Sequence, residues 1–382
     1  MRNTFLAVCA AVLLTFAPAA AARADTLWVT TLEAVLGLDP VTLEIRRTIP
    51  LRKELSGALH LLPTPDNRTV YLLSGGREVV SALDLVEGKV TASWSLSERM
   101  GEDPDAPRIA NARFSGIAID HAGKRIVGNI VTSRRSGTNP HQLERIGVDA
   151  PYLAVLDAAT GKRLATISGA PWATSFIEAM RDPAHPNRFL VISPDLDIID
   201  LDRLPAGKAP VRATFEQVRV KHVPLREPYM AGQGPVVILT EWFHPEPSGG
   251  LGSTPYYTTD PIVEKDQMGV VTMDLVTSKV DVLELGPVQG PQYAFSTVVA
   301  PDRRRAYSVF NQLHEIDLMK RKITRIKDLP YTYYGANMSP DGKLLYIFSG
   351  GARLARIDPE SLDIVKEVEL PSEAWDILTL PD

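Results

Sequence analysis

The seven histidines are the first residues to consider for metal or acid–base chemistry, because imidazole binds metals and titrates near neutral pH. They are His60, His121, His141, His185, His222, His244 and His314. No two of them have the short spacing that places a metal pair on one strand or one helix. We therefore predict no metal site and expect scattered surface or turn histidines, with a site built across distant segments as the alternative.

Nucleophiles and phosphate-binding loops are the next possibility, and the sequence offers little support for them. Cys9 is the only cysteine, and it lies in an N-terminal stretch that we expect to be removed. A mature chain without a thiol excludes disulfides, iron–sulfur clusters and cysteine-linked haem. The sequence contains no Gly-x-Ser-x-Gly, Walker or dinucleotide-binding motif. We therefore predict no catalytic residue and no cofactor in this chain.

Residues 1–24 have the three parts of a secretory signal peptide. Arg2 supplies the charge, an apolar run follows from Phe5 to Phe16, and small residues lead to Ala24. This run is too short to span a bilayer, so we expect cleavage near Ala24, export to the periplasm through the Sec pathway and no membrane insertion. Removal of Arg2 and Arg23 changes the formal net charge from −5 to −7. An acidic chain argues against a nucleic-acid partner.

The elements that would position any site are repeated strands. An alternating apolar strand that ends in Asp, followed by a polar turn and a second strand, recurs seven times. The intervals between successive Asp residues are 45, 73, 43, 74, 43 and 41 residues, and a four-stranded propeller blade takes about 40 to 45. The seven copies close at Leu38-Asp39, Leu83-Asp84, Leu156-Asp157, Ile199-Asp200, Met273-Asp274, Ile316-Asp317 and Ile357-Asp358.

The two long intervals each hold one blade plus inserted segments. These segments lie near 101–107 and 132–150, and at 204–233 with 241–267. Strand alternation dominates throughout, and Ser175 to Met180 would form one helical turn at most.

A second motif, an apolar strand ending in a Pro-Asp or Asp-Gly turn, precedes most copies of the repeat. The first copy lacks it, whereas residues 375–382 have the pattern with no blade after it. We predict that this C-terminal strand completes the first blade, which hides the sheet edges that an open array would expose. The predicted fold is all-β: one domain over residues 25–382, a seven-bladed β-propeller of four-stranded antiparallel blades closed by the N- and C-terminal strands.

One turn resembles the docking repeats of propeller dehydrogenases that bind pyrroloquinoline quinone. It runs from Val155 to Lys162 and contains Asp157, Thr160 and Gly161. The tryptophan expected shortly after the lysine is replaced by Leu164-Ala165-Thr166. We therefore interpret this segment as an ordinary blade turn, in which Asp and Gly satisfy the turn geometry.

Two aromatic stretches depart from the repeat. One runs from Glu241 to Thr258 inside the fifth blade, and the other from Pro330 to Asn337 before the seventh. Long loops on a rigid scaffold often carry binding groups, and aromatic side chains with polar tips suit a protein–protein surface. The alternative is that these tyrosines only cap the propeller.

At these stretches the chain resembles the β subunit of quinohemoprotein amine dehydrogenase. The resemblance covers roughly the last 150 residues. In the residues before them, only the spacing of the blade repeats and the signal peptide match. It is carried by Ser248 to Thr258, Met273-Asp274-Leu275, Phe295-Ser296-Thr297, Tyr333-Tyr334 with Asn337, Ser339 to Gly342, and Asp358-Pro359-Glu360-Ser361-Leu362.

The resemblance implies a periplasmic heterotrimer that oxidises primary amines to aldehydes and ammonia. It places a tryptophan-derived quinone on a small γ subunit and two haems c on an α subunit, with this chain as the cofactor-free propeller that holds them. The Glu241 to Thr259 loop would then face the quinone subunit. The residues expected to contact the partner or line the substrate cavity are Trp242, His244, Tyr256, Tyr257, Phe295, Tyr333, Tyr334 and Asn337.

Two alternatives remain. One is a stand-alone propeller, such as a lactone hydrolase or a ligand-binding protein, with its site in the central channel. The other is the heavy subunit of a methylamine-type dehydrogenase, which is also a periplasmic seven-bladed propeller. The partner distinguishes the second alternative from the main hypothesis, and this sequence does not contain the partner.

Overall fold

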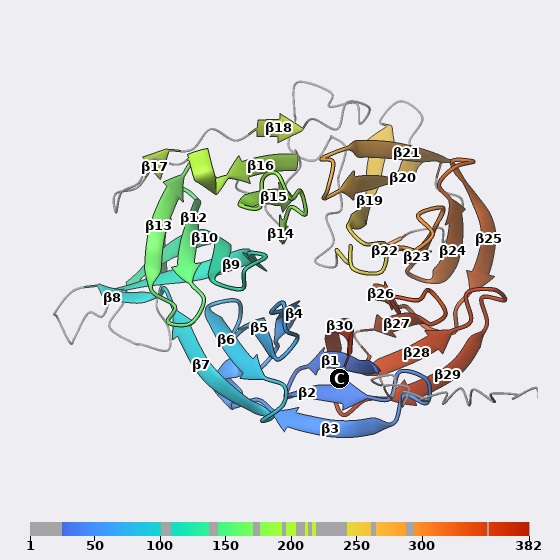
Figure 1. The fold of residues 1–382 in the computed structure, drawn as a ribbon, viewed down its shortest axis with the longest axis horizontal. Helices are drawn as coiled ribbons and strands as arrows, with labels where there is room; N and C mark the ends of the chain where they lie inside the picture. Colours follow the sequence, from blue (N-terminus) through green and yellow to red (C-terminus); the bar gives the residue numbers. More distant parts are fainter. Residues whose placement is uncertain are drawn as a thin grey trace, which may run out of the picture.

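The strands form seven separate sheets around a central axis, and this arrangement is a seven-bladed β-propeller (Figure 1). The predicted fold class is therefore confirmed. The computed structural model describes residues 25–100, 108–136, 144–170, 176–192, 196–203, 211–212, 216–218, 243–260, 265–287, 294–349 and 351–381.

Five blades have four strands each, and in each of them the strands lie in the following order from the channel outwards. Blade 1 contains β30 (Ala374–Pro381), β1 (Asp25–Thr31), β2 (Ala34–Leu38) and β3 (Ile45–Pro50). Blade 2 contains β4 (Leu59–Pro63), β5 (Thr69–Ser74), β6 (Val79–Asp84) and β7 (Lys89–Ser95). Blade 4 contains β14 (Phe176–Ala179), β15 (Arg188–Ile192), β16 (Leu196–Asp200) and β18 (Glu216–Val218). Blade 6 contains β22 (Ser296–Val299), β23 (Arg305–Val309), β24 (Gln312–Asp317) and β25 (Lys322–Asp328), and blade 7 contains β26 (Gly335–Met338), β27 (Leu345–Ser349), β28 (Arg353–Ile357) and β29 (Ile364–Glu369).

The other two blades are less regular. In blade 3 a core of β9 (Arg108–Ile119), β10 (Arg125–Ser136), β12 (Tyr152–Asp157) and β13 (Arg163–Ser168) is extended by β8 (Glu98–Met100), β11 (Glu144–Val148) and β17 (Val211–Arg212). In blade 5 the described strands are β19 (Leu251–Asp260), β20 (Lys265–Asp274) and β21 (Val280–Pro287). The only helices in the described ranges are two single 3-10 turns, η1 (Lys53–Leu55) and η2 (Leu201–Arg203), and neither is long and apolar enough to cross a membrane.

The repeated aspartate has a local physical role in every blade. In all seven copies one of its carboxylate oxygens accepts a hydrogen bond from a backbone N–H two or three residues later; Asp317, for example, accepts from Met319 at 3.0 Å and Lys320 at 2.8 Å. Where the next strand follows directly, as in the six blades other than blade 4, this closes the turn between the two outer strands. The segment from Asp157 to Lys162 forms the same turn, with Gly161 at a positive φ of 67°.

The chain ends close the ring as predicted. Strand β30 pairs antiparallel with β1 along its length, from Asp25 opposite Pro381 to Thr31 opposite Ala374. It brings Ile377 into the core between blades 7 and 1, and Leu378 and Leu380 into the core between blades 1 and 2. Ring closure thus replaces two exposed sheet edges with a buried strand.

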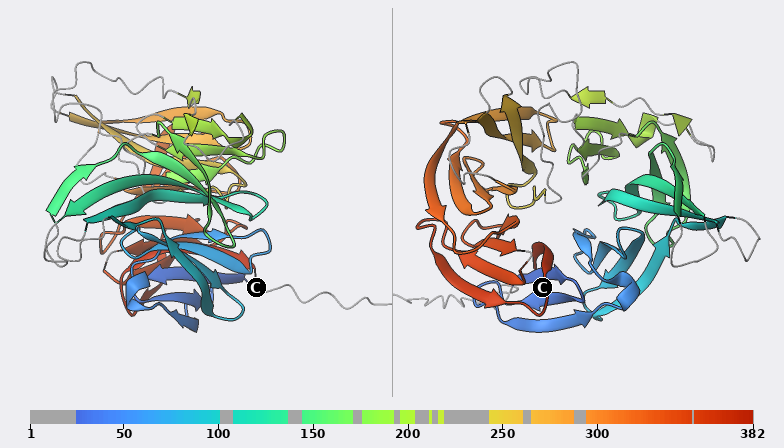
Figure 2. Two further views of the ribbon diagram at one scale, coloured as in Figure 1. Left: turned by 90° about the vertical axis from the view of Figure 1, so that its left-hand side faces the viewer. Right: turned by 180° about the vertical axis from the view of Figure 1, so that it is seen from behind.

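The two ends of the ring differ because the innermost strands run the same way in blades 1 to 4, 6 and 7, the blades whose innermost strand the structure describes. We call the end at which these strands begin the aromatic face, and the end at which they finish the cavity face. The start of β9 and the end of β10 extend past the aromatic face, as the side view in Figure 2 shows, whereas the turns after β4, β9 and β14 lie at the cavity face. Ser175 to Met180, expected to form a helical turn at most, contains β14, an innermost strand.

Candidate functional site

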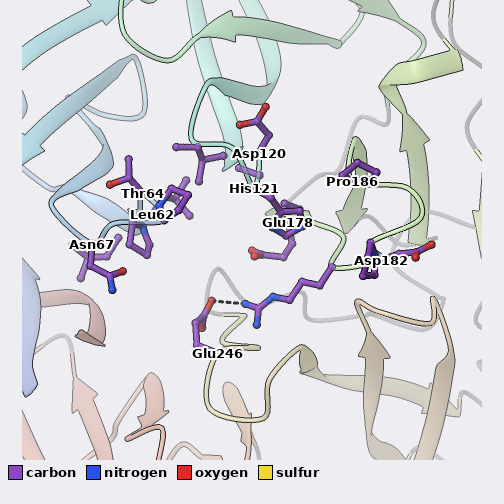
Figure 3. Close-up of a pocket in the computed structure, with 17 residues that line it drawn as sticks. Leu62, Thr64, Asn67, Asp120, His121, Glu178, Asp182, Pro186 and Glu246 are labelled. Carbon is purple, nitrogen blue, oxygen red and sulfur yellow. Dashed lines mark hydrogen bonds and ion pairs between the residues drawn. The ribbon is translucent and has the colours of Figure 1, made fainter. Parts of the chain in front are cut away.

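A cavity of about 660 Å³ opens at the cavity face of the central channel (Figure 3). The turns that follow β4, β9 and β14 form three of its sides, and Glu246, which precedes β19, forms another. Its walls are largely apolar, with Leu62, Pro65 and Pro186 among them. A concave, mostly apolar site with a few convergent polar groups is the usual form of a small-molecule pocket.

Three ionisable groups meet at the wall of this cavity. Glu178 on β14 and Arg181 just after it face Glu246, and Arg181 Nη2 lies 3.5 Å from Glu246 Oε1 (Figure 3). Burial and the negative charge of Glu246 raise the pKa of Glu178 to about 8, while Arg181 acts against this shift. Burial also raises the pKa of Glu246, again opposed by Arg181. The single guanidinium of Arg181 therefore has to balance two carboxyl groups, and Glu178 and Glu246 together tend to keep a proton.

The chain of polar groups continues across the channel through His244 and Asp376. His244 Nδ1 lies 3.9 Å from Glu246 Oε2, and His244 Nε2 lies 3.5 Å from Asp376 Oδ1. Backbone N–H groups of Leu61 and Ile377 donate to the carboxylate of Asp376, each at 2.8 Å. Burial raises the pKa of Asp376 to about 7 and lowers that of His244 to about 4.

A short loop fixes His244 and Glu246 in place. Ser248 Oγ donates to the carbonyl of Leu251 at 2.7 Å and lies 3.1 Å from the carbonyl oxygen of Pro245, and Arg303 of blade 6 donates to the carbonyl of Ser248 at 2.7 Å. The ring of Phe243 covers Gly252 so closely that a Cβ there would lie 1.9 Å from it. The loop is therefore held from both sides, as a binding group on a rigid scaffold must be.

His60 borders the same channel from blade 2. It lies at a bulge in β4, has a positive φ of 57°, and is buried. A non-glycine residue in this backbone region is uncommon and persists only where the surroundings impose it. Burial, with smaller contributions from Arg77 and His244, lowers the pKa of His60 to about 3.

This arrangement suits proton exchange. Glu178 and Asp376 have pKa values raised to about 8 and about 7, in the range where acid–base groups act at neutral pH. Within the described ranges of the chain, no three His, Cys, Asp or Glu side chains converge as a metal site would require.

Only His244 of the residues predicted from the sequence lies in this cluster. Tyr256 is 3% exposed, and its ring covers Gly269 in the core of blade 5. Tyr257 lies in β19 opposite Met268, and Trp242 lies outside the described residues. The Glu241 to Thr259 loop therefore contributes one of these predicted residues to the channel and one to the core.

Tyr333 and Asn337 are also buried, and both bind within this chain. The hydroxyl of Tyr333 donates to Glu367 Oε2 at 2.6 Å. Asn337 Nδ2 donates to the carbonyl of Ile377 at 2.7 Å, which links the innermost strands of blades 7 and 1. Both side chains therefore stabilise the propeller. For Tyr333 this agrees with the alternative that the tyrosines of this stretch only cap the propeller.

Phe295 and Tyr334 form a different site, on the aromatic face. With Phe310 they make a cluster whose ring centroids lie 5.1 to 6.1 Å apart. Phe295 and Phe310 are half-buried and Tyr334 is 36% exposed. We call these three residues the aromatic cluster. Half-exposed rings in edge and stacked contacts are typical of surfaces that bind another protein.

Glu178, Arg181, Glu246 and Asp376 were not predicted as site residues. Asp376 lies in the C-terminal strand and Glu178 in a stretch without a clear strand pattern, so neither had a local motif. The one available signal was a charged residue inside an otherwise apolar innermost strand, because such a residue is rarely buried without a role.

The fold and site define a seven-bladed propeller with a polar central channel. No protein-family model and no curated protein match this chain. The chain is similar in structure to dihydro-heme d1 dehydrogenase NirN in complex with DHE, at a TM-score of 0.53 and 16% identity over 93% of this chain and 75% of that one. It is also similar to a functionally unknown protein from Desulfotomaculum acetoxidans DSM 771, at a TM-score of 0.55 and 14% identity over 94% of this chain and 99% of that one. At these identities the similarity concerns the propeller fold alone.

Proposed function

We propose that this protein is a periplasmic scaffold subunit of an amine-oxidising complex of the quinohemoprotein amine dehydrogenase type. The observation that carries the proposal is the aromatic cluster, because two of its three members, Phe295 and Tyr334, belong to the stretches that resemble that β subunit. The cluster offers apolar area with a polar tip on a rigid face, as a docking surface requires.

In this proposal the reactive groups belong to the partners. A small γ subunit carries the tryptophan-derived quinone, a dihaem α subunit accepts the electrons, and the propeller supplies surface and rigidity. The signal-like segment at residues 1–24 supports export to the periplasm.

Co-expression of this chain with the neighbouring reading frames tests the proposal. We expect a complex that turns over primary amines, and we expect Phe295→Ala with Tyr334→Ala to reduce its yield by about tenfold or more. The matched control is Tyr331→Ala, a tyrosine on the same segment that is 46% exposed and lies under Arg353 instead of in the cluster. Amine turnover by the isolated propeller, or an unchanged yield from the double variant, would refute the proposal.

The channel cavity favours a second candidate, a stand-alone propeller that binds a small ligand in its centre. Its support is the cavity of about 660 Å³ that Glu178, Arg181 and Glu246 help to line. Thermal shift of the isolated chain with lactones and with small organic cations separates the candidates, because only a stand-alone binding protein should respond strongly without partners.

A further inference from the structure

A second pocket lies beyond the aromatic face, where the turn between β5 and β6 meets the start of β9 and the end of β10 in blade 3. Its volume is about 290 Å³. Three arginines line it, Arg77 from blade 2 and Arg113 and Arg135 from blade 3, and the remaining lining residues are Phe114, Ser115, Val131, Ser133 and Val148. We call it the arginine pocket. None of these described lining residues is acidic.

Backbone carbonyls hold two of the three guanidinium groups. Arg113 Nε donates to the carbonyl of Gly76 at 3.1 Å, and Arg77 Nη1 donates to the carbonyl of Ser115 at 3.4 Å. The two arginines thus tie blade 2 to blade 3 reciprocally. Burial, and after it the positive charge of the nearby Arg113, lowers the pKa of Arg77.

The neighbouring arginines are compensated by carboxylates, whereas Arg113 and Arg135 of the pocket keep a local excess of positive charge. Arg134 lies 3.0 Å from Asp149, and Arg125 lies 2.8 Å from Asp120. Among the residues whose placement is described, no carboxylate lies within 4.0 Å of Arg113 or Arg135. The full sequence has a net charge of −5, so this local excess is opposite in sign to the chain as a whole.

We propose that the arginine pocket binds a carboxylate side chain of the protein partner that docks on the aromatic face. Guanidinium groups bind carboxylates in charge-assisted, frequently bidentate pairs. Val131 and the 41% exposed Val148 would pack against the methylene stem of a Glu or Asp. The location of the partner rests on the proposed function, whereas the anion chemistry of the pocket does not.

The test uses the chain from residue 25 onwards and a fluorescent hexaglutamate peptide at low salt. We expect the peptide to bind, and Arg113→Gln with Arg135→Gln to weaken binding by about tenfold or more. The control, Lys322→Gln with Lys366→Gln, removes the same charge from exposed positions on β25 and β29 and should change binding less than about twofold, because exposed charges act weakly. Thermal unfolding of each variant verifies that it is folded.

Equal weakening by both double variants would show general electrostatic attraction and overturn the proposal. Tighter binding of inorganic phosphate than of the peptide would assign the pocket to a free anion and would also overturn it. In the co-expressed complex, Arg113→Gln with Arg135→Gln should lower the yield most at low salt, and the difference from the parent should shrink as salt rises, because salt screens the charge pairs of the parent. If peptide binding depends on the pocket but no amine-oxidising complex forms, the proposed function fails while the carboxylate chemistry of the pocket stands.

Discussion

The cavity face and the aromatic face are built on the same repeated strands but carry different chemistry. At the cavity face, residues from blades 1, 4 and 5 bring Glu178, Glu246, His244 and Asp376 into the channel. At the aromatic face, the starts of β22 and β26 present Phe295 and Tyr334 near the surface. The difference shows that the repeated residues determine the frame, by which we mean the strands and turns of the seven blades. Residues that are not part of the repeat determine what each face can bind.

Removal of β30 is the change with the largest expected effect, because it should abolish both faces together. Deletion of residues 374–382 takes away the strand that closes blade 1 and exposes Leu27 and Val29 of β1, now buried. We expect loss of the cooperative unfolding transition, since each buried leucine or isoleucine removed costs about 1.5 to 3 kcal/mol. Thermal unfolding followed by near-UV circular dichroism measures this. Deletion of residue 382 alone is the control, and a cooperative transition in both variants would contradict terminal closure.

The adjacent residues Tyr333 and Tyr334 allow a buried tyrosine of the frame to be compared with a tyrosine at the surface. Tyr333 is fully buried and bonded to Glu367, whereas Tyr334 is 36% exposed. We expect Tyr333→Ala to lower the free energy of unfolding by about 3 to 5 kcal/mol and Tyr334→Ala by less than about 1 kcal/mol. Chemical denaturation of the two variants measures both values. Similar losses would mean that Tyr334 belongs to the frame and would weaken its assignment to a docking surface.

The cavity face should reveal itself through the pH dependence of stability. Between about pH 4 and pH 8, Glu178 and Asp376 keep their protons in the folded protein because their pKa values are raised, whereas the same groups lose their protons in the unfolded chain. The free energy of unfolding therefore falls as pH rises through this range. His244 and His60 have lowered pKa values of about 4 and about 3, so their contribution rises with pH and is complete above about 6.5. Between pH 6.5 and 8 only the carboxylate effect remains.

We therefore expect Glu178→Gln to flatten the loss of stability between pH 6.5 and 8. At pH 8 the variant should be more stable than the parent by about 1 to 2 kcal/mol, an order-of-magnitude figure that allows for partial exposure to the cavity. Urea unfolding at half-unit pH steps gives the profile. Glu369→Gln, on the exposed outer strand β29, is the control and should leave the slope unchanged. A parallel profile for Glu178→Gln would show that this carboxyl carries no buried proton.

The smallest expected effect is that of a substitution at one repeated aspartate, which should lower stability slightly without altering either face. Asp317→Ala removes the acceptor for the N–H groups of Met319 and Lys320 and should cost about 1 kcal/mol, whereas Asp317→Asn keeps an acceptor oxygen and should cost a few tenths. Thermal unfolding distinguishes the two. A larger cost for Asn than for Ala would rule out the turn hydrogen bond as the reason for the repeated aspartate.

The strands and turns of the blades could be predicted from the sequence because each depends on residues that are close together in the chain. An aspartate and the N–H groups two and three residues later are enough to specify the outer turn, and alternation specifies the strands. The unpaired strand pattern at residues 375–382 likewise predicted closure, which the pairing of β30 with β1 confirms.

The candidate site could not be predicted in the same way. Glu178, His244 and Asp376 come from three distant parts of the chain and meet only after the ring has closed. Aromatic composition also failed to separate Tyr334, at the surface, from Tyr256 and Tyr333, in the core. Exposure depends on which side of a blade each residue occupies, and a shift of one position along a strand reverses it.

Hydrogen exchange of this chain, alone and in complex with the products of the neighbouring reading frames, tests the central claim most directly. A scaffold that docks a partner through its aromatic face predicts slower exchange on complex formation at residues 113–115, 310–311 and 331–335, with residues 64–67 and 181–186 of the cavity face unchanged. Slower exchange at the cavity face, with the aromatic face unchanged, would contradict it.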